Sequence, residues 1–227
     1  MFTVMCRNSA GQQSSYNLDT VPDACPICHN GIQPIPAGAD HLLRNDFVIE
    51  RTFACPVASC NRLFIGRYFK NPGSGYFYLQ QCVPIEPAKE SFSAELQKIS
   101  PDYCSIYEQA HKAEQLGLAL ISGPGYRKAL EFLIKDYLTL LQRTDDDKKE
   151  IADLPLMACI KKYVQDKRML MTAERATWLG NDETHYVRRW EDKDLQDMKN
   201  LIQLTCYWIL SEHLTSAAAV AMPQGRK

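Results

Sequence analysis

Hydrophobic and polar positions follow two different patterns along this chain of 227 residues. Before residue 84, short runs of β-branched and aromatic residues lie between turn residues, a pattern typical of β-strands. It predicts strands over 46–55, 62–69 and 75–82, and the stretch "NPGSG" predicts a turn that joins the last two as a hairpin. After residue 87, apolar residues recur every three or four positions, which predicts helices.

The helical part carries clear start and stop signals. The side chain of Ser100 can cap a helix, and Pro101 fits its first turn. Gly117 and the pair Gly180-Asn181 are typical helix ends. The pattern predicts helices over 101–116, 123–142, 154–164, 172–179 and 192–214, with an exposed charged loop over 144–150.

Together these patterns predict an α+β fold class that is mainly α. A small β module should occupy residues 1–86, a bundle of about five helices residues 87–217, and a flexible tail residues 218–227. The chain contains no internal repeat, so we expect two different domains rather than two copies of one.

Composition and charge then narrow the function. Hydrophobic residues make up 45% of the chain, as in ordinary soluble proteins, and the net charge is −1. No overall positive field is available to hold nucleic acid, so such a role would need a local basic patch. No apolar run is long enough to cross a membrane, and the N-terminus lacks the pattern of a signal peptide. The nine cysteines, an odd number, argue against a disulfide framework and favour a reducing cytoplasm.

Four of these cysteines form two close pairs. The stretch "CPIC" holds Cys25 and Cys28, and "CPVASC" holds Cys55 and Cys60. Two tight turns that each present two thiolates build a tetrahedral zinc site, and with four cysteines no position is left for water. The sequence therefore predicts a structural Zn²⁺ in a zinc ribbon, where metal binding contributes folding free energy.

Two other interpretations of these pairs remain open. The cysteines could be ordinary buried residues, or one pair could be a redox centre. His29 and His41 are nearby candidates for substitute metal ligands.

A second candidate site lies in "WLGNDETHYVRRW", residues 178–190. His185 suits general acid–base chemistry because its pKa lies near neutrality, but it could equally bond a backbone carbonyl beside a helix end. Arg188 and Arg189 could bind substrate or could simply be surface charges. The stretch begins and ends with tryptophans, which we expect to be core or interface residues.

A third feature lies on the predicted helix 123–142. Arg127, Glu131 and Lys135 recur every four residues, which is typical of an ion-pair ladder on an exposed face. The alternative is that Arg127 orients His185 or binds phosphate.

The helical half resembles a known family. The stretches "RKALEFLIKDYL" and "GN…H", within about residues 90–215, are similar to domain-of-unknown-function family 4145 (DUF4145), and a "CPxC…C" zinc ribbon also occurs at the N-terminus of members. That resemblance implies a HEPN-like (higher eukaryotes and prokaryotes nucleotide-binding) helical bundle in a bacterial or phage protein linked to phage defence or restriction. It also implies a homodimer through the last helices.

Active HEPN proteins resemble metal-independent endoribonucleases in which four to six residues separate an arginine from the histidine that follows it. Here those positions before His185 are Trp178, Leu179 and Gly180, so an arginine would have to come from elsewhere in space. The candidates for this catalytic site are His185, Asn181, Arg175 and Arg127.

Two hypotheses follow. The first is a zinc-binding module, noncatalytic or weakly catalytic, that binds RNA, DNA or a partner protein in the cytoplasm. The alternative is a HEPN-type endoribonuclease, a toxin-like defence effector that uses His185. The missing spacing favours the first hypothesis, and the pair Asn181/His185 favours the second.

Overall fold

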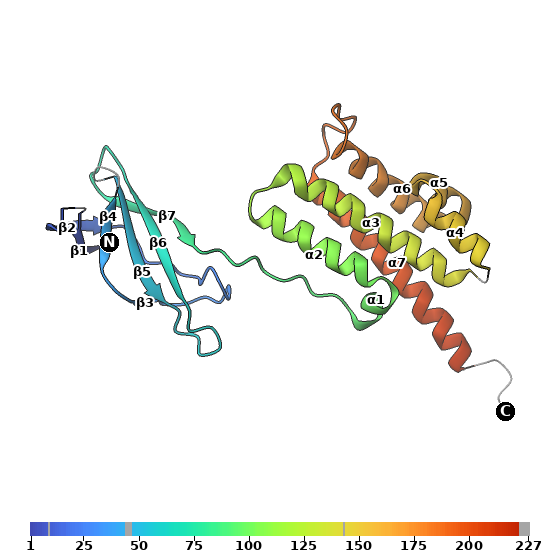
Figure 1. The fold of residues 1–227 in the computed structure, drawn as a ribbon, viewed down its shortest axis with the longest axis horizontal. Helices are drawn as coiled ribbons and strands as arrows, with labels where there is room; N and C mark the ends of the chain where they lie inside the picture. The colour runs from blue at the N-terminus through green and yellow to red at the C-terminus, as the bar shows by residue number, and fades with distance from the viewer. Residues whose placement is uncertain (9, 44–46, 143, 223–227) are drawn as a thin grey trace. The chain divides into compact units, whose positions relative to one another are not determined.

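The structure is a computed structural model that describes residues 1–8, 10–43, 47–142 and 144–222. The chain divides into two compact units, Met1–Ala88 and Lys89–Lys227 (Figure 1). The first unit holds the strands and the second the helices. Each unit has its own hydrophobic core, so each is described by itself.

The described residues of the first unit form seven strands in one mixed sheet. The strands are β1 (Phe2–Arg7), β2 (Gln13–Leu18), β3 (Ile35–Pro36), β4 (Asp40–Leu43), β5 (Val48–Ala54), β6 (Leu63–Lys70) and β7 (Phe77–Val83). Their order is β3-β5-β4-β1-β2-β7-β6, and β5 also pairs with β6. Because of that extra pairing, the strands from β5 through β4, β1, β2, β7 and β6 close into a ring.

Two parallel pairings complete the ring, β1 with β4 and β2 with β7, whereas the other neighbours are antiparallel. Alternate residues of the strands are buried, as in β1, where Val4 and Cys6 are buried and Thr3 and Met5 are exposed. The largest fully buried side chains of this unit are Tyr68, Phe53, Phe64, Phe77, Leu18 and Ile49.

This sheet corrects the predicted fold. The strands expected over 46–55, 62–69 and 75–82 are found as β5, β6 and β7, with Asp46 outside the described residues, and β6 and β7 form the expected hairpin. The prediction of a small zinc ribbon was wrong, because β1 to β4 enlarge it to a seven-stranded mixed sheet in the described residues. Strand β2 was missed because, of its six residues, only Leu18 is buried and most others are polar.

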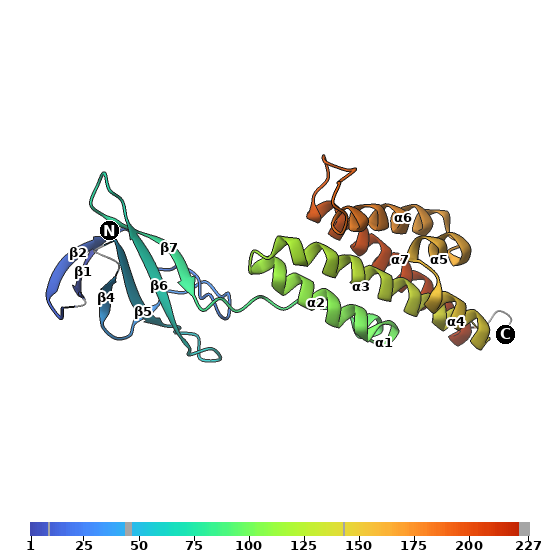
Figure 2. The same cartoon turned by 45° about the horizontal axis from the view of Figure 1, so that its top comes forward.

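The described residues of the second unit form seven helices. They are α1 (Ala94–Ile99), α2 (Pro101–Gln115), α3 (Ala119–Leu141), α4 (Asp145–Asp153), α5 (Leu156–Tyr163), α6 (Lys167–Asp182) and α7 (Leu195–Ala221). Helices α2 and α3 run side by side in both views (Figures 1 and 2). Gly125 permits this approach, since a Cβ atom there would lie 2.9 Å from the Cβ of Ala110.

The bundle of about five helices was therefore also wrong. Helix α1 was missed although Ser93 caps it by accepting a hydrogen bond from the Leu96 amide. Helix α4 replaces the loop expected over 144–150. Its start signals were present in the sequence: Thr144 caps the helix, and aspartates in the first turn are stabilised by the helix dipole.

The predicted helix boundaries hold at some positions and fail at others. Ser100 caps α2 as expected, by accepting a hydrogen bond from the Tyr103 amide. Helix α6, however, continues through Gly180 to Asp182. Helix α7 continues to Ala221, so the boundary placed at 217 falls within a helix; residues 223–227 of the expected tail lie outside the described residues.

Candidate functional site

The four predicted metal ligands come together in the β unit. Cys25 and Cys28 lie in the loop before β3, and Cys55 and Cys60 lie in the loop between β5 and β6. All four Sγ atoms lie within 4.8 Å of one another; they are 3.9 Å apart for Cys25 and Cys60, and 3.8 Å apart for Cys28 and Cys55. Four sulfurs bound tetrahedrally at 2.3 Å from zinc are about 3.8 Å apart, so this cluster is compatible with a metal site.

The backbone of each loop is built to turn both sulfurs inward. Cys25 donates its amide to the Asn30 carbonyl at 3.0 Å, and Cys55 donates its amide to the Arg62 carbonyl at 3.0 Å. The residue after the second cysteine of each pair is left-handed, with φ of 59° at His29 and 43° at Asn61. The two loops therefore share one design, although the second pair has two more residues between its cysteines.

Hydrogen bonds and burial shift the pKa values of the cysteine thiols in opposite directions. Hydrogen bonds from the backbone and side chain of Asn30 lower the pKa of Cys28 to about 6. Burial raises the pKa of Cys55 to about 12. A cation at the centre would release the protons of thiols such as Cys55 by binding their sulfurs, so metal binding here is coupled to proton release.

No other cluster of three or more such ligands occurs among the described residues. His29 and His41 do not join the cysteines. The Nε2 atom of His29 lies 2.6 Å from the Glu86 carbonyl oxygen, and His41 lies in β4 opposite Glu50. The remaining cysteines lie elsewhere: Cys6, Cys82, Cys104, Cys159 and Cys206.

The second candidate site is built around the loop that joins α6 to α7. The rings of Trp178 and Trp190 are stacked with centroids 6.0 Å apart and planes 6° apart. This aromatic pair lines a hollow of about 830 Å³. The hollow is also lined by Asn181, Asp182, His185, Tyr186, Val187 and Arg189.

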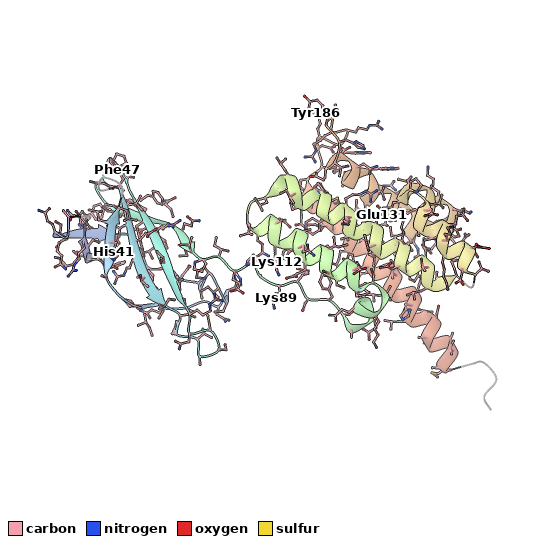
Figure 3. The ribbon with its side chains drawn as sticks, in the orientation of Figure 1. His41, Phe47, Lys89, Lys112, Glu131 and Tyr186 are labelled. Carbon is pink, nitrogen blue, oxygen red and sulfur yellow. The ribbon has the colours of Figure 1, made fainter. Side chains whose placement is uncertain are left out.

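A buried carboxylate holds the loop in place. Asp182 is 5% exposed, and its Oδ2 atom accepts hydrogen bonds from the amides of Arg189 at 2.9 Å and Trp190 at 2.7 Å. These bonds bring Trp190 back over α6, where it stacks on Trp178. Tyr186, in contrast, is fully exposed and projects outward at the outer end of the loop (Figure 3).

The predicted catalytic residues divide between this hollow and its surroundings. His185 and Arg189 line the hollow together with Asn181. Arg127 lies behind them on α3, where its Nε atom donates to the Asn181 side chain at 3.2 Å. Arg175 lies over the Trp178 ring, 5.7 Å from its centroid, and does not line the hollow.

The predicted basic residues also differ in their surroundings. Arg188 is engaged locally, since it pairs with Glu183 at 3.2 Å and donates to the Lys193 carbonyl at 3.0 Å. In the described part of the chain, the side chain of Arg189 makes no hydrogen bond or ion pair with another residue. Arg189 is therefore available to a ligand in the hollow.

The ladder predicted on α3 is present and is connected to the site. Glu131 pairs with Arg127 at 3.3 Å and with Lys135 at 2.9 Å. Arg127 thus bridges the ladder and the Asn181 side chain, whereas its predicted role in orienting His185 or binding phosphate stays a prediction.

A smaller hollow of about 320 Å³ lies against the same tryptophans. It is lined by Arg175, Trp178, Leu179, Trp190, Lys193, Asp197, Asn200 and Leu201. The stacked indoles are therefore shared by both hollows, with Arg189 in the larger and Arg175 and Lys193 in the smaller.

Three features of this site were not foreseen from the sequence. Gly180 is not a helix end but a contact point: a Cβ atom there would lie 3.1 Å from the Cβ of Arg127. Trp190, expected to be a core or interface residue, is 40% exposed, so it is not part of the core of this unit. No sequence signal marked Asp182, because an acidic residue at a helix end usually faces water.

No protein-family model matches the chain, and neither a curated protein nor a solved structure matches it. The resemblance to domain-of-unknown-function family 4145 therefore stays a prediction. Among the helices of residues 1–222 that the structure describes, none combines the length and apolar character needed to cross a membrane.

Proposed function

We propose that this protein is a noncatalytic, zinc-stabilised module that binds single-stranded nucleic acid through the loop between α6 and α7. In this proposal the four cysteines hold one structural Zn²⁺, whose chemistry is to cross-link the two loops. The sulfur spacing and the all-cysteine donor set support zinc over magnesium or calcium, which prefer oxygen ligands. Thiolate ligands require a reducing compartment, which supports a cytoplasmic location.

The observation that carries the binding function is the stacked pair Trp178/Trp190 with arginines beside it. Every nucleobase can stack on an aromatic ring, and each stacked base contributes about 1–3 kcal/mol. Arg189 supplies a cation without an internal partner, and exposed Tyr186 supplies a further ring. The acid of the larger hollow, Asp182, already accepts two backbone amides, which offset its charge.

Binding to a fluorescent single-stranded oligonucleotide tests this proposal. Trp190→Ala should weaken binding about tenfold or more, because one stacking partner is lost. Tyr207→Ala is a matched control, since Tyr207 is an exposed aromatic residue of α7 that lines neither hollow. Equal affinity of wild type and Trp190→Ala, or preference for duplex, would contradict the proposal.

Salt dependence provides an independent measurement. If Arg189 and Lys193 each contact one phosphate, the logarithm of the affinity should fall against the logarithm of salt with a slope near about −1.4. Arg189→Ala should reduce this slope by about one half. A slope near zero in the wild-type protein would show that phosphate contacts are absent.

A second candidate function is metal-independent cleavage of RNA. The specific observation in its favour is that His185 and Arg189 line the same hollow. His185 would remove the proton of a 2′-hydroxyl, whose oxygen attacks the adjacent phosphorus and expels the 5′-oxygen. The proton held by His185 would then pass through water to the 5′-oxygen, leaving a 2′,3′-cyclic phosphate. Arg189 would stabilise the negative charge that develops on the phosphate oxygens.

Cleavage of single-stranded RNA in buffer without divalent cations separates the two candidates. If the protein is a ribonuclease, His185→Ala should lower the rate about 100-fold or more while binding is retained. If wild type binds but does not cleave, the binding module is supported. Family membership, homodimer formation and a role in phage defence remain predictions from the resemblance alone.

A further inference from the structure

The end of α6 presents two polar side chains beside the stacked tryptophans. Asn181 and Asp182 follow Trp178 by three and four residues, so all three lie on one side of the helix. All three line the larger hollow, whose volume of about 830 Å³ is within the range of sites for small ligands. A flat ring that stacks on the indoles can therefore bring its edge to an amide and a carboxylate.

The orientation of the Asn181 amide is fixed by Arg127. The Nε atom of Arg127 donates to the Asn181 side-chain oxygen at 3.2 Å, and an arginine side chain can only donate hydrogen bonds. Arg127 is in turn held by its ion pair with Glu131. The Nδ2 atom of Asn181 has no hydrogen-bond partner among the residues that the structure describes. Asn181 therefore offers N–H donors to a ligand in the hollow.

The Asp182 carboxylate offers the complementary group. Its Oδ2 atom accepts hydrogen bonds from the amides of Arg189 and Trp190, which fixes the side chain. Its Oδ1 atom has no partner within the described ranges of the chain, and it is not shut off from the hollow that Asp182 lines. One carboxylate oxygen can accept two hydrogen bonds. The hollow thus places an acceptor for two donors next to the donors of Asn181.

This arrangement matches the Watson–Crick edge of guanine. Guanine presents the acceptor O6 beside two donors, N1–H and N2–H, so O6 can accept from Asn181 while both donors meet Asp182. Adenine, cytosine and uracil can each offer one acceptor to the amide and one donor to the carboxylate. Among the common bases, guanine alone has two adjacent donors on this edge.

We infer that the hollow selects guanine in a single strand, with N1–H and N2–H of the base donating to Asp182. This inference rests on the proposed binding function and names the base that the same site prefers. Stacking on the tryptophans supplies affinity for any base, and the carboxylate supplies the selection. In a duplex the Watson–Crick edge is already paired, so these contacts are open only to an unpaired base.

Binding of two single-stranded oligonucleotides tests this inference. Each probe is a run of cytidines with one central purine, guanine in the first and hypoxanthine in the second. Hypoxanthine is guanine without the N2 amino group. The wild-type protein should bind the guanine probe about tenfold or more tightly, because the hypoxanthine probe lacks one hydrogen bond to a charged group. Equal affinity for the two probes would overturn the inference.

A variant separates selection from the folding of the loop. In Asp182→Asn the side-chain oxygen can still accept the amides of Arg189 and Trp190, and the NH₂ group then takes the place of Oδ1. This variant should bind both probes with equal affinity, because its N–H groups cannot accept from N2–H. Its tryptophan fluorescence should match that of the wild type. A preference for guanine that survives in Asp182→Asn would contradict the inference.

Asp192→Asn is the matched control. Asp192 is an exposed acid of the same loop and lines neither hollow. The same chemical change there should leave the preference for guanine at its wild-type value. A loss of preference in this control would show that the net charge of the loop, rather than the position of Asp182, selects the base.

The two probes also keep this inference distinguishable from the proposed function. If the wild type binds both probes equally and Trp190→Ala weakens both, the protein binds single strands by stacking and the inference alone is wrong. If the wild type binds neither probe, the proposed function fails and the inference fails with it.

Discussion

The molecule holds two irregular regions in place by opposite means. In the β unit, two loops bring four sulfurs together, and sulfurs repel one another once they are deprotonated. In the helical unit, the loop between α6 and α7 brings backbone N–H groups to one carboxylate, Asp182. In the proposed metal site the first arrangement would take a cation from solution, whereas the second is complete within the chain.

The two regions should therefore respond differently to their surroundings. If the proposed metal holds the cysteine loops, their order depends on the supply of that metal in solution. The order of the loop held by Asp182 depends only on that buried carboxylate and its charge, because the amides that donate to it belong to the chain itself. Removing the organising group in each region should therefore affect one unit and leave the other unchanged.

Disruption of the cysteine cluster should change the stability of the protein most. Cys55→Ser should abolish stoichiometric zinc binding and the cooperative unfolding transition of the β unit, since zinc supplies much of the folding free energy of such sites. The thermal transition of the helical unit should be retained. Elemental analysis and calorimetry measure both. Cys104→Ser is the control, because Cys104 lies in α2 outside the cluster; a full equivalent of zinc in Cys55→Ser would contradict the prediction.

Removal of the Asp182 carboxylate in the helical unit should have the second largest effect. Asp182→Ala leaves the amides of Arg189 and Trp190 without their acceptor, at a cost of about 2–4 kcal/mol in the free energy of unfolding. The stacking of Trp190 on Trp178 should be lost, which a change in tryptophan fluorescence reports. Asp192→Ala, an exposed position in the same loop, should change neither quantity. Unaltered fluorescence in Asp182→Ala would show that Asp182 does not hold the loop.

A smaller effect is expected where α3 meets α6. Gly180→Ala forces the side chain of Arg127 to move, at a cost of about 1–3 kcal/mol. In the Arg127→Ala background the same substitution should be nearly neutral. Denaturant unfolding of the four proteins gives the coupling energy. Additive effects would mean that Arg127 and Gly180 are not in contact.

The smallest effect concerns pH in the helical unit. Burial would raise the pKa of Glu114, but hydrogen bonds from Tyr126 at 2.5 Å and Lys199 at 2.9 Å outweigh it and lower the pKa below 4.5. A lowered pKa contributes stability above the pKa of the unfolded chain, and this contribution is lost as pH falls through the folded value. Glu114→Gln should therefore flatten the loss of stability below about pH 4.5 by roughly 1 kcal/mol or less, because the side chain is 31% exposed.

Unfolding measured from pH 7 to pH 3 tests this. Glu95→Gln, which changes another acid at the start of α1, should leave the profile of the wild-type protein unchanged. Identical profiles for Glu114→Gln and wild type would show that Glu114 contributes no acid-dependent stability.

Local signals predicted part of this fold correctly. Strands β5 to β7 could be predicted because aromatic and β-branched residues fill them, and α2 because Ser100 and Pro101 mark its start. Strand β2 could not, because its place depends on pairing with β7, far along the chain. Helix α4 was not predicted because a run of charged residues is also typical of an exposed loop, although Thr144 is a recognisable cap.

The two candidate sites also differ in how far local signals predicted them. The cysteine cluster could be predicted because the spacing of the cysteines in two short motifs is typical of metal ligands. The hollow beside Trp178 could not, because it depends on Asp182 folding the loop back and on Gly180 admitting Arg127. The sequence shows which residues are present in these places, but their roles come from contacts between separate helices.

The pairing of β2 with β7 also bears on the order in which the protein can fold during synthesis. Leu18 lies opposite Phe77, so the ring cannot close until almost the entire first unit has left the ribosome. The two cysteine loops precede β7 in the chain, and both are exposed to the cell before closure. Metal captured at that stage would bring β5 and β6 together early and shorten the wait for the last strand.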